Sequence, residues 1–118
     1  EKNIKILGYK KNPYPFIKYS NVLVLTSKYE GLPNVLLEAI TLKRFVISSD
    51  CPTGPKEILD NGKGGMLFKT GNYKDLSKKI ILCKSQTKVI KRKINYAYSS
   101  LKKYDSEKNL NLYYKNLI

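Results

Sequence analysis

Two glutamates stand where this sequence is best suited to chemistry. Glu30 lies in a short polar turn, and Glu38 lies in the apolar run that follows it. A continuous apolar segment at 22–26, typical of a buried parallel strand, ends just before the turn, and Pro33 opens the second run. Because the fixed φ of proline suits the first turn of a helix, the spacing predicts a helix N-terminus flanked by two carboxylates.

The predicted helix start is suited to binding a phosphate. The N–H groups of a first helical turn and the positive end of the helix dipole attract anions. The backbone of Gly31, Leu32, Pro33, Asn34 and Val35 would surround such an anion. We therefore expect these residues to contribute to ligand binding.

Glu38 is unusual because the helix around it is otherwise almost entirely apolar. A carboxylate in such a helix is costly unless something donates hydrogen bonds to it. Asn34, Glu38 and Thr41 fall on one polar stripe, at i, i+4 and i+7. For a helix taken alone, a stripe solvated by water or holding a lysine is the commoner outcome. The adjoining strand, turn and second carboxylate favour a pocket in which Glu38 accepts hydrogen bonds from ligand hydroxyls.

Strand-like and helix-like segments alternate along the chain. Strands are predicted at 3–7, 22–26, 45–48 and 66–68, and helices at 13–19, 33–42, 56–59, 73–84, 87–103 and 105–118. The alternation predicts an α/β fold, with a Rossmann-like, mostly parallel sheet and flanking helices. Ligands of such sheets bind at the carboxyl ends of the strands, where Gly8, Glu30, Gly31 and the loop 50–54 are expected.

Residues 30–38, EGLPNVLLE, contain two glutamates separated by seven residues. This segment resembles the signature of the retaining, GT-B-fold glycosyltransferases of family 4, also called group 1. Other segments follow the order and spacing of the family, namely 6–8, 21–27, 45–49, 54–57 and 65–68. The resemblance covers about residues 3–82 and implies the C-terminal, donor-binding half of a GT-B glycosyltransferase.

The resemblance implies a reaction and a role for each glutamate. A sugar would pass from a nucleotide-sugar, a UDP-sugar, to an envelope glycan or lipid-linked acceptor, with retention at the anomeric carbon. Glu30 would act as the catalytic glutamate that contacts the donor sugar, and Glu38 would hold ribose hydroxyls. The backbone of residues 31–35 would stabilise the diphosphate leaving group.

Two further loops are candidate parts of the same site. By resemblance, the loop at Gly8 and Tyr9 would lie near the nucleotide base, although an exposed loop tyrosine is the commoner outcome. The resemblance also implies that Thr53 and Gly54 approach the donor from the opposite lip of the crevice. Where the family places a glycine after the central helix, this chain has Lys43. A left-handed backbone there would cost a lysine about 1 kcal/mol.

The chain is predicted to be a single, partial nucleotide-sugar-binding domain over 1–118. Its core would span 3–82, followed by C-terminal helices at 86–118. In the family's sheet, two strands lie between those at Ile4 and Val22, and they have no counterpart before Asn3. We therefore expect a fragment of a longer protein whose N-terminal acceptor domain is missing, and a chain that is inactive alone.

The composition is strongly basic, with 23 Lys and Arg, nine Asp and Glu, and a net charge of +14. Such a charge attracts polyanions and anionic lipid headgroups, so peripheral contact with the inner face of the membrane is expected. A compositional bias of the genome explains the lysines equally well. Only Arg44 and Arg92 are arginines, which argues against specific reading of nucleic acid.

The two cysteines and the absence of histidine narrow the chemistry. Cys51 and Cys83 are expected to be reduced thiols in the cytoplasm rather than a disulfide or a metal site. Without histidine, Ser-His and Cys-His nucleophile schemes are excluded. The sequence has no Asp-x-Asp motif, so we expect no metal and no cofactor, the nucleotide-sugar being a substrate.

Two rival interpretations remain open. A non-catalytic nucleotide-sugar-binding module would bind the donor without turnover. A basic polyanion-binding protein would bind DNA or RNA with strong salt dependence, unaffected by changes at Glu30 and Glu38.

Overall fold

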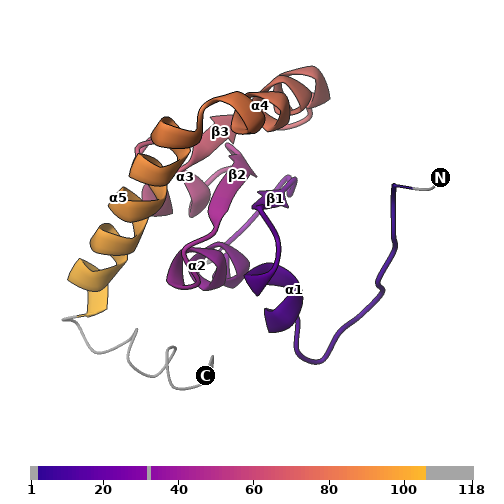
Figure 1. Cartoon of the computed structure of the whole chain (residues 1–118), viewed down its shortest axis with the longest axis horizontal. Helices are drawn as coiled ribbons and strands as arrows, with labels where there is room; N and C mark the ends of the chain where they lie inside the picture. The colour runs from indigo at the N-terminus through magenta and orange to yellow at the C-terminus, as the bar shows by residue number, and fades with distance from the viewer. Residues whose placement is uncertain (1–2, 32, 106–118) are drawn as a thin grey trace.

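The computed structural model describes residues 3–31 and 33–105. In chain order, its elements are α1 (Tyr14–Lys18), β1 (Val22–Leu25), α2 (Asn34–Thr41), β2 (Phe45–Ser49), α3 (Pro55–Ile58), β3 (Met66–Phe68), α4 (Tyr73–Ser85) and α5 (Thr87–Asp105) (Figure 1). The order of strands and helices from β1 onward is the one that the sequence predicts. The predicted helix at 105–118 falls almost wholly outside the described residues.

The three strands form one parallel sheet in the order β1-β2-β3. Val22 pairs with Phe45, and Ile47 pairs with Met66. All five residues of the central strand β2 are buried, as expected for a strand with helices on both faces. The prediction of an α/β fold with a mostly parallel sheet is confirmed.

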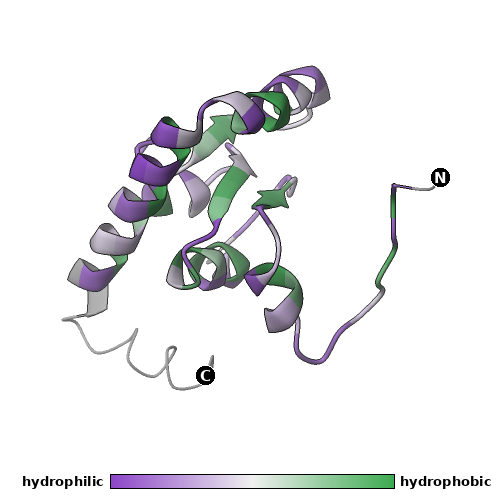
Figure 2. Ribbon diagram, in the orientation of Figure 1, coloured by the Kyte–Doolittle hydropathy of each residue, from purple (hydrophilic) through white to green (hydrophobic). Residues whose placement is uncertain are grey.

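Alternate residues of β2 point into two hydrophobic clusters, one on each face of the sheet. Val46 belongs to the first cluster, with Ile17, Leu36, Leu37, Ala39, Ile40, Leu59, Ala97 and Leu101. Phe45 and Ile47 belong to the second with Phe68, and Leu76, Cys83, Ile90 and Ile94 pack against it. Helix α5 contributes to both clusters, with Ile90 and Ile94 on one side and Ala97 and Leu101 on the other (Figure 1). Figure 2 shows hydrophobic residues concentrated in the strands and in α2.

The loop before β3 fits closely against α5. A side chain on Gly64 would place its Cβ 2.9 Å from the Cβ of Ala97, so only glycine permits this approach. The Lys93 ammonium donates hydrogen bonds to the carbonyl oxygens of Gly62 and Gly65. Burial, and then the neighbouring Arg92, lower the pKa of Lys93. The position of α5 is therefore fixed by a polar contact as well as by its apolar face.

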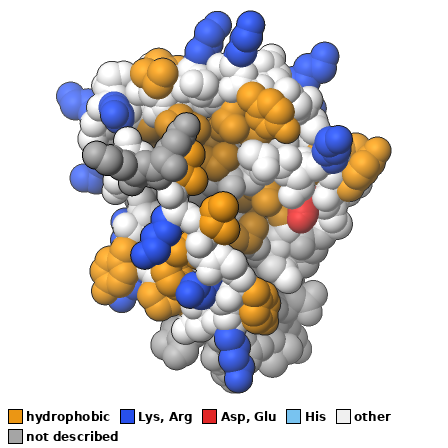
Figure 3. Space-filling view, turned by 90° about the vertical axis from the view of Figure 1, so that its right-hand side faces the viewer, with side chains coloured by type: hydrophobic (Ala, Val, Ile, Leu, Met, Phe, Trp, Pro, Cys, Tyr) orange, Lys and Arg blue, Asp and Glu red, His pale blue; other side chains and the backbone are white. Residues whose placement is uncertain are grey.

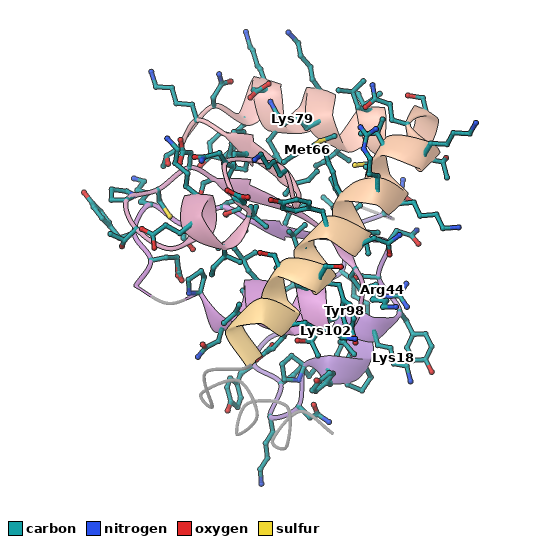
Figure 4. The ribbon with its side chains drawn as sticks, turned by 90° about the vertical axis from the view of Figure 1, so that its left-hand side faces the viewer. Lys18, Arg44, Met66, Lys79, Tyr98 and Lys102 are labelled. Atoms are coloured by element: carbon teal, nitrogen blue, oxygen red, sulfur yellow. The ribbon has the colours of Figure 1, made fainter. Side chains whose placement is uncertain are left out.

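Helix α2 ends at a residue with a left-handed backbone, as the sequence predicts. Lys43 has a φ of +55°, and its N–H bonds to the Ile40 carbonyl at 2.9 Å. The next N–H, of Arg44, bonds to the Ala39 carbonyl at 2.8 Å, which completes a Schellman motif. The Lys43 ammonium lies 4.6 Å from the centre of the Tyr98 ring on α5. Figure 4 shows Tyr98 beside Lys102 and near Arg44, the residue that precedes β2.

The prediction of a strand at residues 3–7 is wrong. This segment has no regular secondary structure, and Ile4 and Ile6 are 68% and 92% exposed. In Figure 1 it runs well away from β1 and the rest of the sheet. An alternating pattern makes a strand only where a neighbouring strand supplies hydrogen bonds and a core covers the apolar face. Among the described residues, β2 is the sole partner of β1, so the segment receives neither.

No helix within residues 3–31 and 33–105 combines the length and the apolar character needed to cross a membrane.

Candidate donor-binding site

The candidate site lies at the carboxyl edge of the sheet, where the loops after β1 and β2 meet. These loops carry the Glu30 turn and the segment from Asp50 to Gly54. Two side-chain hydrogen bonds join them. The Ser49 hydroxyl donates to the Ser27 carbonyl at 2.6 Å, and the Thr53 hydroxyl donates to the Glu30 carbonyl at 2.9 Å. The structure therefore brings Glu30 and Thr53 together, although they are 23 residues apart in the sequence.

Gly54 allows the two loops to touch. It has a φ of +100°, which L side chains rarely adopt. A Cβ at this position would lie 2.7 Å from the Gly31 carbonyl oxygen and 2.8 Å from Cδ of Pro33. Thr53 also has a left-handed backbone, with φ of +57°, and its hydroxyl contact to Glu30 holds it there. Backbone strain of this kind is often stored at binding sites.

Helix α2 begins beside this pair of loops. Pro33 is its N-cap, it has no side-chain cap, and its first turn contains no acidic residue. The positive end of the helix dipole is therefore not offset by a carboxylate of its own first turn. Pro33 is fully buried, whereas Gly31 and Asn34 on either side are exposed. This arrangement offers an anion the first turn of a helix that is held firmly by its buried proline.

Glu38 lies one turn into α2 and is half-buried. It shares a helix stripe with Asn34, about 6 Å away along the axis. The side chain of Tyr14, on α1, is its neighbour: burial, and then the negative charge of Glu38, raise the pKa of Tyr14. Glu38 therefore faces the α1 side of α2 rather than the core. A carboxylate in that position can accept hydrogen bonds from hydroxyl groups.

Some predicted site residues are not assembled in this way. Gly8 and Tyr9 lie in the extended N-terminal segment, and Tyr9 is 92% exposed, so the structure does not bring them to the Glu30 turn. Leu32 lies outside the described residues. The side chain of Val35 packs against the first hydrophobic cluster, which leaves only its backbone for a ligand.

No group of three or more Asp, Glu or Cys within residues 3–31 and 33–105 is arranged to hold a metal ion. The absence of a metal in the reaction stays a prediction. Cys51 is buried, Cys83 is half-buried, and neither forms a disulfide. Burial raises the pKa of the Cys83 thiol, which makes it a poor nucleophile at neutral pH.

Sequence reasoning missed Ser49 and Tyr14. Ser49 is fully buried at the end of β2, and its bond to Ser27 fixes where the Glu30 turn begins. A serine pair that ends an otherwise apolar strand was the available signal, since a buried hydroxyl needs a partner. For Tyr14 no signal existed, because its position beside Glu38 depends on how α1 docks on α2.

The chain is similar in sequence to known glycosyltransferases. The family model described as "Glycosyl transferases group 1" matches residues 1–100. An uncharacterized glycosyltransferase of Methanocaldococcus jannaschii is 52% identical over 59 residues, which are 50% of this chain and 14% of that protein. The N-acetylgalactosamine-N,N'-diacetylbacillosaminyl-diphospho-undecaprenol 4-alpha-N-acetylgalactosaminyltransferase of Campylobacter jejuni is 25% identical over 108 residues, which are 92% of this chain and 30% of that protein.

A solved structure extends the likeness to three dimensions. It is the crystal structure of a variant of S. aureus TarM in complex with Fondaparinux, alpha-GlcNAc-glycerol and UDP. The TM-score is 0.82 at 26% identity, over 99% of this chain and 24% of that one. The chain thus spans less than a third of each of these three proteins. Since the family model covers most of its length and its sheet and helices match a GT-B enzyme, the chain belongs to the glycosyl transferases group 1 family.

Proposed function

We propose that this chain forms the donor-binding part of a retaining glycosyltransferase. The enzyme would transfer a sugar from a nucleotide-sugar, a UDP-sugar, to an envelope glycan or a lipid-linked acceptor. The observation that carries the proposal is the junction of the two loops at the start of α2. There, the Thr53–Glu30 hydrogen bond and the close approach of Gly54 to Gly31 hold a helix N-terminus at the carboxyl edge of the sheet.

The diphosphate would bind at the N-terminus of α2. A leaving diphosphate gains negative charge as the bond to the sugar breaks, and donors already fixed in place stabilise that charge without reorganising. The exposed Gly31 and Asn34, on either side of the buried Pro33, supply backbone at this point. The N-cap residue, Pro33, makes no side-chain hydrogen bond to this first turn.

The two glutamates would bind hydroxyl groups on different parts of the nucleotide-sugar. Glu38, one turn into α2 and beside Tyr14, would accept hydrogen bonds from the ribose, each worth about 1.5–3 kcal/mol for a charged acceptor. Glu30 is half-buried in the turn itself, and its backbone is held by Thr53. It would contact the donor sugar and act as the catalytic glutamate. The family resemblance and these positions support both roles.

The relatives support the choice of substrates. UDP and alpha-GlcNAc-glycerol are named in the TarM complex, and a diphospho-undecaprenol acceptor is named for the Campylobacter enzyme. We propose by analogy a UDP-sugar as donor and a glycan or lipid-linked acceptor, bound mainly by the rest of a longer protein. The two free cysteines are consistent with a protein that acts in the cytoplasm.

The proposal is tested by titrating UDP into the full-length protein and into its Glu38→Gln variant. Losing the charged acceptor should weaken UDP binding by about tenfold or more, while the volume of the side chain is kept. Asp75→Asn is the matched control, because Asp75 lies on α4 and is paired there with Lys79 at 2.6 Å. Equal affinities of Glu38→Gln and the unmodified protein would exclude the ribose role. Turnover of a UDP-sugar would then separate an enzyme from a module that only binds.

A further inference from the structure

The outward face of α4 combines lysines with an exposed isoleucine. Leu76 and Cys83 pack toward the sheet, yet no residue of this 13-residue helix is fully buried. On the opposite side, Lys74, Lys78 and Ile81 follow one another at i, i+4 and i+7, and they therefore form one stripe. Ile81 is 65% exposed, more than Ile80 or Leu82 beside it at 41% and 39%.

This stripe is surrounded by positive charge that the described residues do not neutralise. Lys84 lies three residues after Ile81, so it adjoins the same stripe. Residues 73–102 contain nine basic side chains and a single acidic one, for a net charge of +8. That acidic residue, Asp75, is occupied by Lys79. Figures 3 and 4 show basic side chains projecting from the top of the molecule, where α4 lies.

We propose that the outward face of α4, made of Lys74, Lys78, Ile81 and Lys84, binds the anionic surface of a lipid bilayer. Each lysine held near such a surface is stabilised by the negative charge of the headgroups. The flexible lysine stems let the ammonium groups stay at the headgroups while Ile81 enters the boundary with the acyl chains. The proposal is independent of the donor site, because nothing in it involves Glu30, Glu38 or a nucleotide.

The chemistry of this face favours lipid over nucleic acid. Recognition of backbone phosphates often uses the planar fork of arginine, and α4 contains none. An isoleucine at the centre of a nucleic-acid surface would also lack an apolar partner, since the phosphate backbone offers charge alone. On a bilayer the same isoleucine gains by leaving water.

The test is co-sedimentation of the full chain with lipid vesicles. Vesicles of phosphatidylcholine alone should leave the protein in the supernatant, and vesicles with about a third phosphatidylglycerol should bind it. Changing Lys74, Lys78 and Lys84 together to Gln should weaken binding by about tenfold or more. Ile81→Ser, which leaves the charge unchanged, should weaken it several-fold. Salt at about 1 M, where the Debye length is about 3 Å, should release the protein.

The matched control removes three exposed lysines elsewhere, Lys5, Lys11 and Lys28, also to Gln. This variant has the same net charge as the α4 variant and should keep most of the binding. Equal losses in the two triple variants would overturn the proposal, because net charge alone would then explain the effect. An unchanged affinity in Ile81→Ser would overturn it too. So would equally tight binding of a short RNA with the same sensitivity to the α4 changes.

Discussion

Two glycines were expected to lie at the same ligand site, and the structure treats them differently. Gly54 and Gly8 both have a positive φ, +100° and +67°. A Cβ on Gly54 would collide with Gly31 and Pro33, whereas a Cβ on Gly8 would have no atom within 4 Å. The Gly54 loop follows the central strand β2, while the Gly8 loop follows a segment that joins no strand among those described.

The difference shows what positions a loop at a sheet edge. Both loops contain a glycine and follow a segment whose sequence predicts a strand, so these two features alone do not position a loop. The Gly54 loop is held because β2 is buried between two neighbours and because Ser49 and Thr53 bond across to the Glu30 turn. The candidate site is therefore built from the β1 and β2 loops in this chain, and the Gly8 loop takes no part in that assembly.

The largest expected effect separates the two glycines directly. Gly54→Ala should reduce the free energy of unfolding by about 2–3 kcal/mol, because the new methyl group meets a carbonyl oxygen and a proline ring at a strained φ. Gly8→Ala should cost about 1 kcal/mol or less, since only the left-handed backbone opposes it. Urea unfolding of both variants measures the contrast, and equal losses would contradict it.

The hydrogen bond between the two loops should contribute a smaller amount. Thr53→Val keeps the shape of the side chain but removes the donor to the Glu30 carbonyl, so we expect a loss of about 1 kcal/mol in urea unfolding. Thr53→Ser keeps the hydroxyl and should lose less. If the serine variant were the weaker of the two, the hydroxyl would not be what joins the loops.

Replacing Lys43 tests whether relief of left-handed backbone strain stabilises the protein at a position that hydrogen bonds already hold. Its φ of +55° lies at the end of α2, where two backbone hydrogen bonds hold it. Lys43→Gly should raise the free energy of unfolding by about 0.5–1 kcal/mol. The stabilisation from the contact between the Lys43 ammonium and the Tyr98 ring is lost in this variant and reduces that gain. Tyr98→Leu in both backgrounds measures that contact. If Lys43→Gly lowered the free energy of unfolding in the Tyr98→Leu background, the left-handed backbone of Lys43 would not be strained.

The smallest expected effect concerns the phenol of Tyr14. Its pKa is raised above 10.0, first by burial and then by Glu38. Glu38→Gln removes the second cause, so the pKa of Tyr14 should fall only part of the way toward 10.0. The pKa of Tyr14 is higher in the folded than in the unfolded protein. The associated stability is therefore fully present below pH 10 and is lost as the pH rises through the raised pKa of the folded state. Titration of labelled tyrosine by NMR reports the shift, and no change would separate Tyr14 from Glu38.

Local patterns were enough to predict most of the fold. The apolar run at Val22–Leu25 and the alternation of apolar segments predicted the parallel sheet, and the helix end at Lys43 followed from the backbone that this position requires. The segment 3–7 was mispredicted because alternation alone cannot reveal whether a neighbouring strand exists. A strand is stabilised by what lies beside it, and that information is not local.

The candidate site was predictable in its residue types more than in its contacts. The structure places Thr53 and Gly54 against the Glu30 turn, and their approach to a donor from the opposite lip stays a prediction. The Ser49–Ser27 bond and the neighbour relation of Tyr14 and Glu38 were not foreseen. Both join residues more than 20 positions apart, and such contacts follow from how helices and strands pack rather than from the spacing of a motif.

The central claim is that the α2 N-terminus and the two loops joined beside it bind the diphosphate of a nucleotide. The most direct measurement is an NMR titration of UDP into the isotope-labelled full chain, following backbone amides. The account predicts the largest shifts at Gly31, Asn34 and Val35, smaller ones at Thr53 and Gly54, and none on the outward face of α4. Shifts confined to α4 or spread over the lysine-rich surface, with the α2 N-terminus unchanged, would contradict it.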